Sequence, residues 1–290
     1  RLKNRTMHSV QQEDVLFRPT LFEAIRSCIS PMCLLPLFLF ACQQTDFPID
    51  MQYADVKSGR ELPYATVQRF DLTPVDSVAL QLDIPENVRQ SALLTSLTMG
   101  NSGQSLLLLL AKTDPQSHYY DQLFVDRNKD GDFSNDGPPN SGQGQFVSRR
   151  NQHYSEFDRV ALPYDWLHAK TQTEEPFLCK IYFWYPVDGG TPKTCSLMRL
   201  CWREGRFRYG DQQAVVVMVD DDGNGIYDSN DRWALFPQDS LGEKPMIGVH
   251  FFRDATQLGW LDETAFELHI ISPKGDRIHL RRKEIDVSKK

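Results

Sequence analysis

The sequence predicts a mainly β fold, either an antiparallel β-sandwich or two related β-units. Short runs rich in Val, Leu, Phe and Tyr are separated by turn residues, as in YATVQRFDL, SVALQLDI and YYDQLFVD. Alternation of apolar and polar residues is typical of half-buried strands, whereas the continuous run SLLLLLA has the length of a central buried strand. No long amphipathic helix is evident after residue 42. We therefore expect packed antiparallel sheets.

Size and charge limit the classes of protein to consider. The chain has 290 residues and 40% hydrophobic content, enough for one large core or two moderate ones. Its formal net charge of -7 argues against a nucleic-acid partner, because a phosphate-binding surface needs an excess of basic side chains.

The N-terminal region predicts export. Residues 1–41 are expected to be a leader, since the run PMCLLPLFLFAC has about the length of a signal h-region and is too short to span a bilayer. The run ends in Leu39-Phe40-Ala41-Cys42, which resembles the lipobox of bacterial lipoproteins. The resemblance implies a lipid on Cys42 and a cell-envelope protein anchored in the outer membrane or at the cell surface. Two alternatives stay open: a soluble protein with an apolar N-terminus, and a cleaved secretory signal in which Cys42 is a bystander.

The remainder of the chain divides by composition. Residues 42–63 are polar and predict a tether that follows the lipidated cysteine. Residues 64–145 and 146–290 are expected to form a first and a second β-unit, because the Pro/Gly-rich segment GPPNSGQGQ at 137–145 is a flexible connection. The charged tail RRKEIDVSKK is expected to be solvated.

The acidic stretch VDDDGNGIYDSNDRW (219–233) matches the spacing of a 12-residue calcium loop. Gly225 at position 6 permits the sharp bend that brings the two halves together. Oxygen ligands without His or Cys suit calcium better than zinc or copper. The alternative is an Asp/Asn/Gly-rich turn that carries no metal. Ligands are expected at positions 1, 3, 5, 9 and 12 and, through a backbone carbonyl, at position 7, from Asp220, Asp222, Asn224, Asp228, Asp231 and Ile226.

A second acidic loop, VDRNKDGDFSND at 125–136, aligns with the first if one residue is dropped. Its closing carboxylate would be Asp136, one residue early, so we expect a weaker calcium site here. The shared pattern suggests two related β-units. The candidate ligands are Asp126, Asn128, Asp130, Asp132 and Asp136.

Both loops resemble the EF-hand-like D-x-[DN]-x-[DN]-G calcium loops of bacterial cell-surface proteins, which also occur in dockerins and thrombospondin type 3 repeats. The strand-flanked loop followed by Asp231-Arg232-Trp233 looks like those of envelope β-domains that sometimes precede thioredoxin-like domains. The resemblance implies calcium, export and surface anchoring, and it implies no particular reaction.

The cysteines and tryptophans after residue 42 allow further expectations. If FLCKIYFWYP turns near Gly190 into CSLMRLCW, Cys179 would face Cys201, and either a cross-strand disulfide or two buried thiols would result. Trp184, Trp202 and Trp233 are expected in the core of the second unit, and the alternative is an exposed aromatic row that binds sugar rings.

No short catalytic motif occurs: G-x-S-x-G, H-E-x-x-H, a P-loop and G-x-G-x-x-G are all absent, and the region after residue 42 has no C-x-x-C. The sequence therefore favours a non-catalytic, calcium-stabilised envelope lipoprotein of structural or binding type. One alternative is a glycan- or protein-binding module with exposed aromatics such as Tyr119, Tyr120 and Tyr227. Another is an accessory domain of a thiol redox system, or an enzyme without short motifs.

Overall fold

The structure is a computed structural model that describes residues 45–56, 67–78, 81–168, 175–188, 190–238 and 252–285. These residues belong to one compact unit, residues 45–290. The expected leader, Cys42 with its expected lipid, and residues 43–44 and 57–63 of the expected tether lie outside the described residues.

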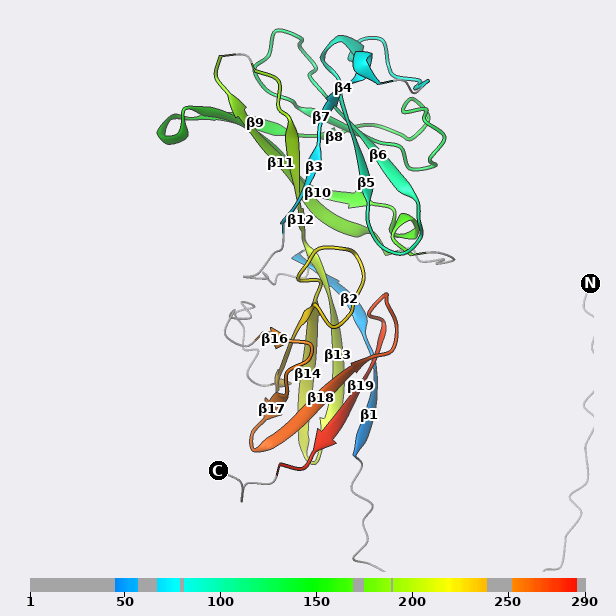
Figure 1. Ribbon diagram of the computed structural model, residues 1–290, viewed down its shortest axis with the longest axis vertical. Coiled ribbons are helices and arrows are strands. Elements are labelled where there is room, and N and C mark those ends of the chain that lie inside the picture. Colours follow the sequence, from blue (N-terminus) through cyan, green and yellow to red (C-terminus); the bar gives the residue numbers. More distant parts are fainter. Residues whose placement is uncertain are drawn as a thin grey trace, which may run out of the picture. The chain divides into compact units, whose positions relative to one another are not determined.

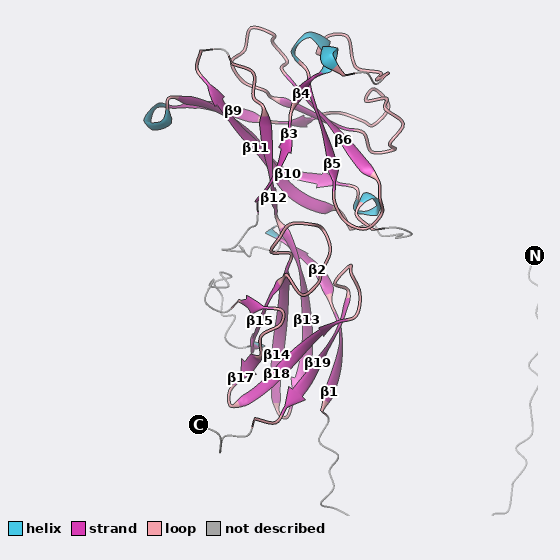
Figure 2. Ribbon diagram, viewed as in Figure 1, coloured by secondary structure: helices cyan, strands magenta, loops and turns pink. Residues whose placement is uncertain are grey.

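The described chain is mainly β, as the sequence predicts, with four antiparallel sheets and short 3-10 turns (Figures 1 and 2). The 3-10 turns are η2 (Val75–Ser77), η3 (Arg89–Ser91), η4 (Ser148–Arg150) and η5 (Tyr164–Trp166).

Two of the sheets, which we call the first sandwich, enclose a common core. One has the strand order β3-β12-β11-β10-β9, and the other has the order β4-β5-β6-β7-β8. Their strands are β3 (Val67–Asp71), β4 (Thr73–Pro74), β5 (Leu93–Thr98), β6 (Ser105–Ala111), β7 (Gln122–Val125), β8 (Asn140–Ser141), β9 (Gln143–Val147), β10 (Gln152–Leu162), β11 (Phe177–Pro186) and β12 (Thr194–Arg199).

The other two sheets form the second sandwich, with strand orders β1-β19-β18-β17 and β16-β15-β14-β13-β2. Their strands are β1 (Asp46–Asp50), β2 (Gln52–Asp55), β13 (Cys201–Tyr209), β14 (Gln212–Val219), β15 (Arg232–Pro237), β16 (Arg253–Asp254), β17 (Gly259–Leu261), β18 (Thr264–Ile270) and β19 (Arg277–Lys283).

The continuous apolar runs become the central strands of their sheets. In β6, Leu106, Leu108 and Leu110 face the core of the first sandwich, while Leu109 and Ala111 pack against a second cluster on the outer face of the same sheet. The strand is therefore covered on both faces, which explains why its sequence does not alternate. β14 repeats this arrangement between two clusters of the second sandwich.

Two strands lie where the sequence suggested a tether. β1 pairs with β19 and β2 pairs with β13, so the body of the protein begins at residue 46 and not near residue 64. The apolar/polar alternation of a strand is present here but short: Phe47, Ile49 and Met51 alternate with Pro48 and Asp50 and are buried. Three apolar positions are too few for this alternation to stand out from a polar segment.

Strand pairing also crosses residue 145, where the sequence suggested a boundary between two β-units. β3 pairs with β12 and joins the sheet of β9, β10 and β11, and β8 and β9 belong to different sheets of the first sandwich. The core of the first sandwich thus draws on residues from both predicted units.

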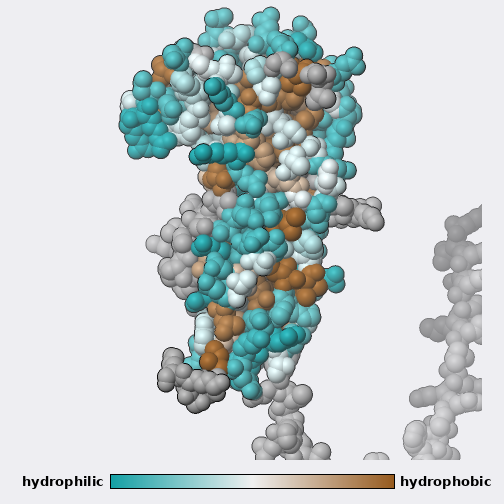
Figure 3. Space-filling model, in the orientation of Figure 1, coloured by the Kyte–Doolittle hydropathy of each residue, from teal (hydrophilic) through white to brown (hydrophobic). Residues whose placement is uncertain are grey.

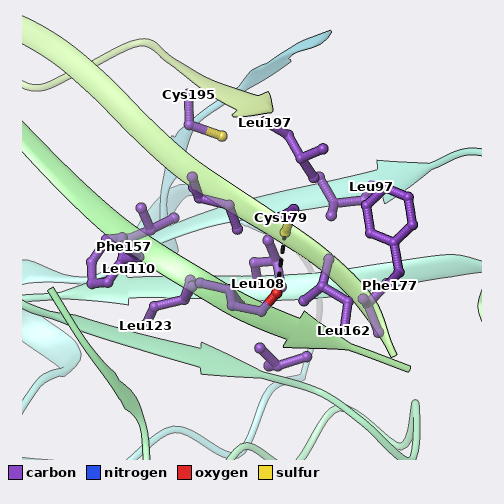
Figure 4. Close-up of a cluster of buried hydrophobic side chains, with 14 of the residues drawn as sticks. Leu97, Leu108, Leu110, Leu123, Phe157, Leu162, Phe177, Cys179, Cys195 and Leu197 are labelled. Atoms are coloured by element: carbon purple, nitrogen blue, oxygen red, sulfur yellow. Dashed lines mark hydrogen bonds between the residues drawn. The ribbon is translucent and has the colours of Figure 1, made fainter. Parts of the chain in front are cut away.

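The cysteines are buried thiols. Cys179 lies opposite Arg199 in the β11–β12 register, two residues from the predicted partner Cys201. Cys179, Cys195 and Cys201 are free in the structure, and the Cys179 thiol donates a hydrogen bond to the Val160 carbonyl at 3.6 Å (Figure 4). Burial raises the pKa of the Cys179 thiol well above its usual range, which keeps the group neutral.

Trp202 and Trp233 are core residues, as expected, with 1% and 0% of their surface exposed. The prediction for Trp184 was wrong, because its position on β11 alternates with buried neighbours and faces outward.

Hydrophilic residues cover most of the face in Figure 3, with smaller apolar patches between them. No helix among the described residues is long and apolar enough to cross a membrane.

We predict that Phe47→Ala lowers the free energy of unfolding by about 3–5 kcal/mol, the usual cost of removing a buried aromatic ring. The Phe47 ring contacts those of Phe207, Tyr209 and Phe266 at centroid distances of 5.4, 5.9 and 6.0 Å. Urea denaturation measures the effect. Asp50→Ala, at an exposed position of the same strand, should change stability by less than about 0.5 kcal/mol. Equal effects of the two variants would contradict the placement of β1.

Candidate metal centre

Both acidic loops join neighbouring antiparallel strands. Residues 126–136 follow β7 and lead to β8, and residues 220–231 connect β14 to β15, where a yellow loop is seen in Figure 1. Each loop is held to a distant segment by its aromatic residue: the Phe133 N–H donates to the Asp83 carbonyl, and the Tyr227 N–H donates to the Pro273 carbonyl. Both rings are 1% exposed. Each loop is therefore anchored in its own sandwich by position 8.

The two loops have the same backbone conformation. Positions 4 and 6 are left-handed in both, with φ of 64° at Lys129, 83° at Gly131, 70° at Gly223 and 82° at Gly225. Three backbone N–H groups donate to side chains in the same way in both loops. The position-5 N–H donates to the side chain at position 3 (Asp130 to Asn128, and Asn224 to Asp222). The position-7 N–H donates to the side chain at position 5 (Asp132 to Asp130, and Ile226 to Asn224), and the position-6 N–H donates to the carboxylate at position 1 (Gly131 to Asp126, and Gly225 to Asp220).

The closing carboxylates correspond as well. The position-2 N–H donates to Asp136 Oδ1 in the first loop and to Asp231 Oδ1 in the second, each at 2.8 Å. Asp136 therefore takes the place of Asp231 although it comes one residue earlier, and the dropped residue lies between positions 8 and 12.

Three carboxylates of the second loop converge. Each of Asp220, Asp222 and Asp231 contributes one carboxylate oxygen, and these three oxygens lie within 4.8 Å of one another. Oxygens that share one calcium ion at 2.3–2.6 Å are at most roughly 5 Å apart, so this spacing fits a common cation. Asp220 and Asp231 are buried, and Asp220 Oδ1 has no hydrogen-bond partner among the described residues. A buried carboxylate oxygen without a donor is costly unless a cation compensates it.

The electrostatics agree with the geometry. Burial, and next the charge of Asp220, raise the pKa of Asp231 to about 8. Burial also raises the pKa of Asp220, while Arg199 and the Gly225 N–H lower it. In this crowded site the negative charges oppose one another, and a bound divalent cation would remove that repulsion.

Other predicted ligands have different contacts. Asp228 caps the Asn230 N–H at 2.7 Å and is not part of the carboxylate group, although position 9 of such loops often binds through water. Asn224 lies against Asp222, with its amide donating to Asp222 Oδ2 at 2.9 Å. The Ile226 carbonyl keeps its place as the position-7 candidate through the backbone conformation that the two loops share.

The first loop gathers fewer carboxylates. Within the described part of the chain, its acidic residues do not form a group of three ligand oxygens. Amides occupy its polar centre instead: Asn128 and Asn135 each donate to Asp130 Oδ2, at 2.8 and 2.9 Å. These hydrogen bonds lower the pKa of Asp130, the contribution of Asn135 being the largest. This loop resembles the second in backbone and is the weaker cation candidate.

A buried arginine completes the second loop. Arg199, at the end of β12, donates to Asp220 Oδ2 at 2.5 Å and to the Tyr227 hydroxyl at 2.9 Å. Its guanidinium also lies over the rings of Phe177 and Tyr227, at 5.1 and 4.9 Å. We did not anticipate this residue from the sequence. Arg199 lies two residues after Leu197 and four after Cys195, and all three side chains are on the buried face of β12. An arginine at such a position is rarely buried without a partner, so the alternation could have indicated a buried ion pair.

Further contacts join the first sandwich to the second loop. The Gly100 N–H donates to the Asn224 carbonyl at 2.7 Å, and the Gln68 side chain donates to the Asp222 carbonyl at 3.3 Å. The loop at 220–231 thus makes contacts with both sandwiches.

The three tyrosines proposed as exposed binding residues do not share an open surface. Tyr120 and Tyr227 are buried, at 6% and 1% exposure, and Tyr119 is half-buried. That expectation was wrong, because Tyr120 faces the first core and Tyr227 anchors the loop.

Comparison with protein-family models, curated proteins and solved structures found no match for this chain.

We predict that Gly100→Ala destabilises the protein far more than Gly103→Ala. Both residues have positive φ, 72° and 70°, which costs an alanine about 1–2 kcal/mol. A Cβ on Gly100 would also lie 1.9 Å from the Leu167 carbonyl oxygen, whereas one on Gly103 meets nothing within 4 Å. Thermal unfolding of the two variants separates the clash from the backbone strain. Equal melting temperatures would mean that Gly100 does not pack against Leu167.

We predict that His168 makes the protein less stable in acid. Burial, followed by the charges of Arg199, Lys274 and Arg203, lowers the pKa of His168 to about 4, and Asp276 opposes this shift. An unfolded histidine has a pKa of about 6.5, so the folded protein binds fewer protons between these values. The stability is complete above about pH 6.5 and is lost as the pH falls to about 4, by about 1–3 kcal/mol.

The measurement is the free energy of unfolding across this pH range for the parent chain and for His168→Gln. The variant should show a smaller loss in acid, and His269→Gln, at a half-exposed histidine, should keep the parent slope. A parent slope in His168→Gln would assign the acid sensitivity elsewhere.

Proposed function

We propose that this chain is a calcium-stabilised, non-catalytic protein of a bacterial cell envelope, anchored through a lipid on Cys42. The observation that carries the calcium proposal is the convergence of Asp220, Asp222 and Asp231 together with the unpartnered buried Oδ1 of Asp220. The envelope location rests on the lipobox-like sequence Leu39-Phe40-Ala41-Cys42.

The donor set favours calcium among the common metals. All its members are hard oxygen ligands, and neither His nor Cys is part of the group. The Arg199 guanidinium shares the charge of Asp220 and therefore competes with the ion. We expect a dissociation constant of about 10⁻⁴ to 10⁻³ M, the range of extracellular calcium modules. Such an affinity suits a protein outside the cytoplasm.

Calcium would act as a staple. The ion would connect Asp220, which directly follows β14, with Asp231, which directly precedes β15. Because the same loop receives Arg199 and the Gly100 N–H from the first sandwich, ordering it would stabilise the contact between the two sandwiches. An ion that binds only the folded state at ten times its dissociation constant adds about 1.4 kcal/mol.

The test is thermal unfolding of the full chain with calcium and with chelator. Saturation at about ten times the dissociation constant should raise the melting temperature by about 3–6 °C. Asp231→Asn, which removes the closing charge of the second loop at nearly constant size, should abolish most of the shift. Asp136→Asn, the equivalent change in the first loop, should have a smaller effect.

Asp211→Asn, at an exposed turn residue, is the matched control and should retain the full shift. An unchanged transition on calcium addition, together with no calcium by elemental analysis, would refute the staple. A shift that survives Asp231→Asn and disappears in Asp136→Asn would move the principal site to the first loop.

A further inference from the structure

The outer face of the sheet β3-β12-β11-β10-β9 carries a cluster of aromatic side chains. Tyr154 on β10 and Tyr182 and Trp184 on β11 are half-buried and alternate with residues of the core. The Tyr154 and Trp184 rings lie 4.5 Å apart between centroids, and the Tyr154 and Tyr182 rings 6.0 Å apart. These three rings, which we call the aromatic platform, make an apolar surface on the side of the sheet away from the core.

A groove adjoins the aromatic platform. It has a volume of about 670 Å³ and is lined by Val67, Arg69, Arg150, Tyr182, Trp184 and Ser196. Its residues come from β3, β11, β12 and η4, so three strands and one turn build it. Register pairs Ser196 with Arg69 and Tyr182 with Ser196, which places these three side chains in one row across the sheet.

The charge of the groove is positive, in contrast to the chain as a whole. Neither Arg69 nor Arg150 forms an ion pair with a carboxylate among the described residues, and the Arg150 guanidinium lies 4.5 Å from the Trp184 ring centroid. The nearby Glu156 is occupied, since it binds Lys180 at 2.6 Å and accepts a hydrogen bond from the Tyr154 hydroxyl at 2.6 Å. Two guanidiniums are thus available for anions beside the aromatic platform.

We infer that this face binds an acidic polysaccharide, one whose pyranose rings stack on Trp184 and Tyr154 and whose carboxylates pair with Arg69 and Arg150. Aromatic faces carry a negative quadrupole that attracts the positively polarised C–H groups of a sugar ring. Arginine matches a carboxylate with two parallel hydrogen bonds. The contact of Arg150 with Trp184 is of the weak, exposed kind and can be exchanged for a sugar carboxylate.

The charge pattern favours an acidic polysaccharide over two other ligands. A neutral glycan would leave both guanidiniums unused. A single-stranded nucleic acid also stacks on aromatic rings, but its phosphates require a basic track along the strand. The groove offers Arg69 and Arg150, which can pair with one or two sugar carboxylates but do not form such a track. The inference concerns a different surface from the calcium site and does not depend on it.

The experiment measures binding of the full chain to polygalacturonate, an acidic pyranose polymer, by isothermal titration calorimetry. The same polymer with its carboxylates methyl-esterified is the neutral comparator, and oligothymidylate is the nucleic-acid comparator. We expect polygalacturonate to bind about tenfold more tightly than the ester, because charge-assisted hydrogen bonds to the arginines are lost in the ester.

Variants assign the site. Trp184→Ala should weaken binding to polygalacturonate about tenfold, the effect of losing one stacking surface. The double variant Arg69→Gln, Arg150→Gln should remove the preference for the acid over the ester while leaving the fold intact, since both side chains are at exposed positions. Trp260→Ala, at a tryptophan that is 41% exposed on β17, is the matched control and should bind as the parent does. Circular dichroism confirms folding of each variant.

Three outcomes would overturn the inference. One is the absence of measurable binding to polygalacturonate by the parent chain. Another is equal affinity for the acid and the ester, or tighter binding of oligothymidylate. The last is parent-like binding by the arginine double variant, which would show that the anion is held elsewhere.

Discussion

The buried ion pair between Arg199 and Asp220 is the interaction on which the arrangement of the loop depends. Asp220 opens the second acidic loop, and its side chain is 0% exposed, so its charge requires compensation inside the protein. The compensating guanidinium comes from β12 of the first sandwich. Removing one partner of such a pair costs about 3–5 kcal/mol, because the other charge remains buried. The loop and the end of β12 therefore have to stay together, and Gly100 and Gly225 provide the close approach that this requires.

The two loops show that backbone conformation and cation affinity are separate properties. Alternate Asp and Asn residues with left-handed positions 4 and 6 produce the same turn twice. In the first loop Asp126 is buried as well, but amides from Asn128 and Asn135 donate to the exposed Asp130 carboxylate. In the second, Asp231 is buried beside Asp220, and burial raises the pKa of both. The second loop is distinguished by the convergence of Asp220, Asp222 and Asp231, which the shared backbone conformation alone does not produce.

Sequence reasoning succeeded where the signal was local. The apolar runs of β6 and β14 have the length of central strands, and the ligand spacing brought Asp220, Asp222 and Asp231 together as expected. It failed where partners are distant along the chain. β1 has too few residues to show a period. The partner of Cys179 moved by two positions because the pairing of β11 with β12 is centred one residue before Gly190. The contact of Arg199 with Asp220 spans 21 residues and two sandwiches, which no spacing rule encodes.

The phase of a strand also decides what a large aromatic residue contributes. Trp202 and Trp233 lie in the buried phase of β13 and β15 and strengthen a core. Trp184 has similar neighbours in sequence but stands in the outward phase of β11, opposite Tyr154. There its apolar area is not fully withdrawn from water, so it contributes less to folding than a core tryptophan does. A half-exposed ring beside two arginines is better suited to contacts with a ligand than to packing. The loop at 220–231 contacts both sandwiches, whereas the half-exposed rings of Tyr154, Tyr182 and Trp184 lie on the outer sheet face.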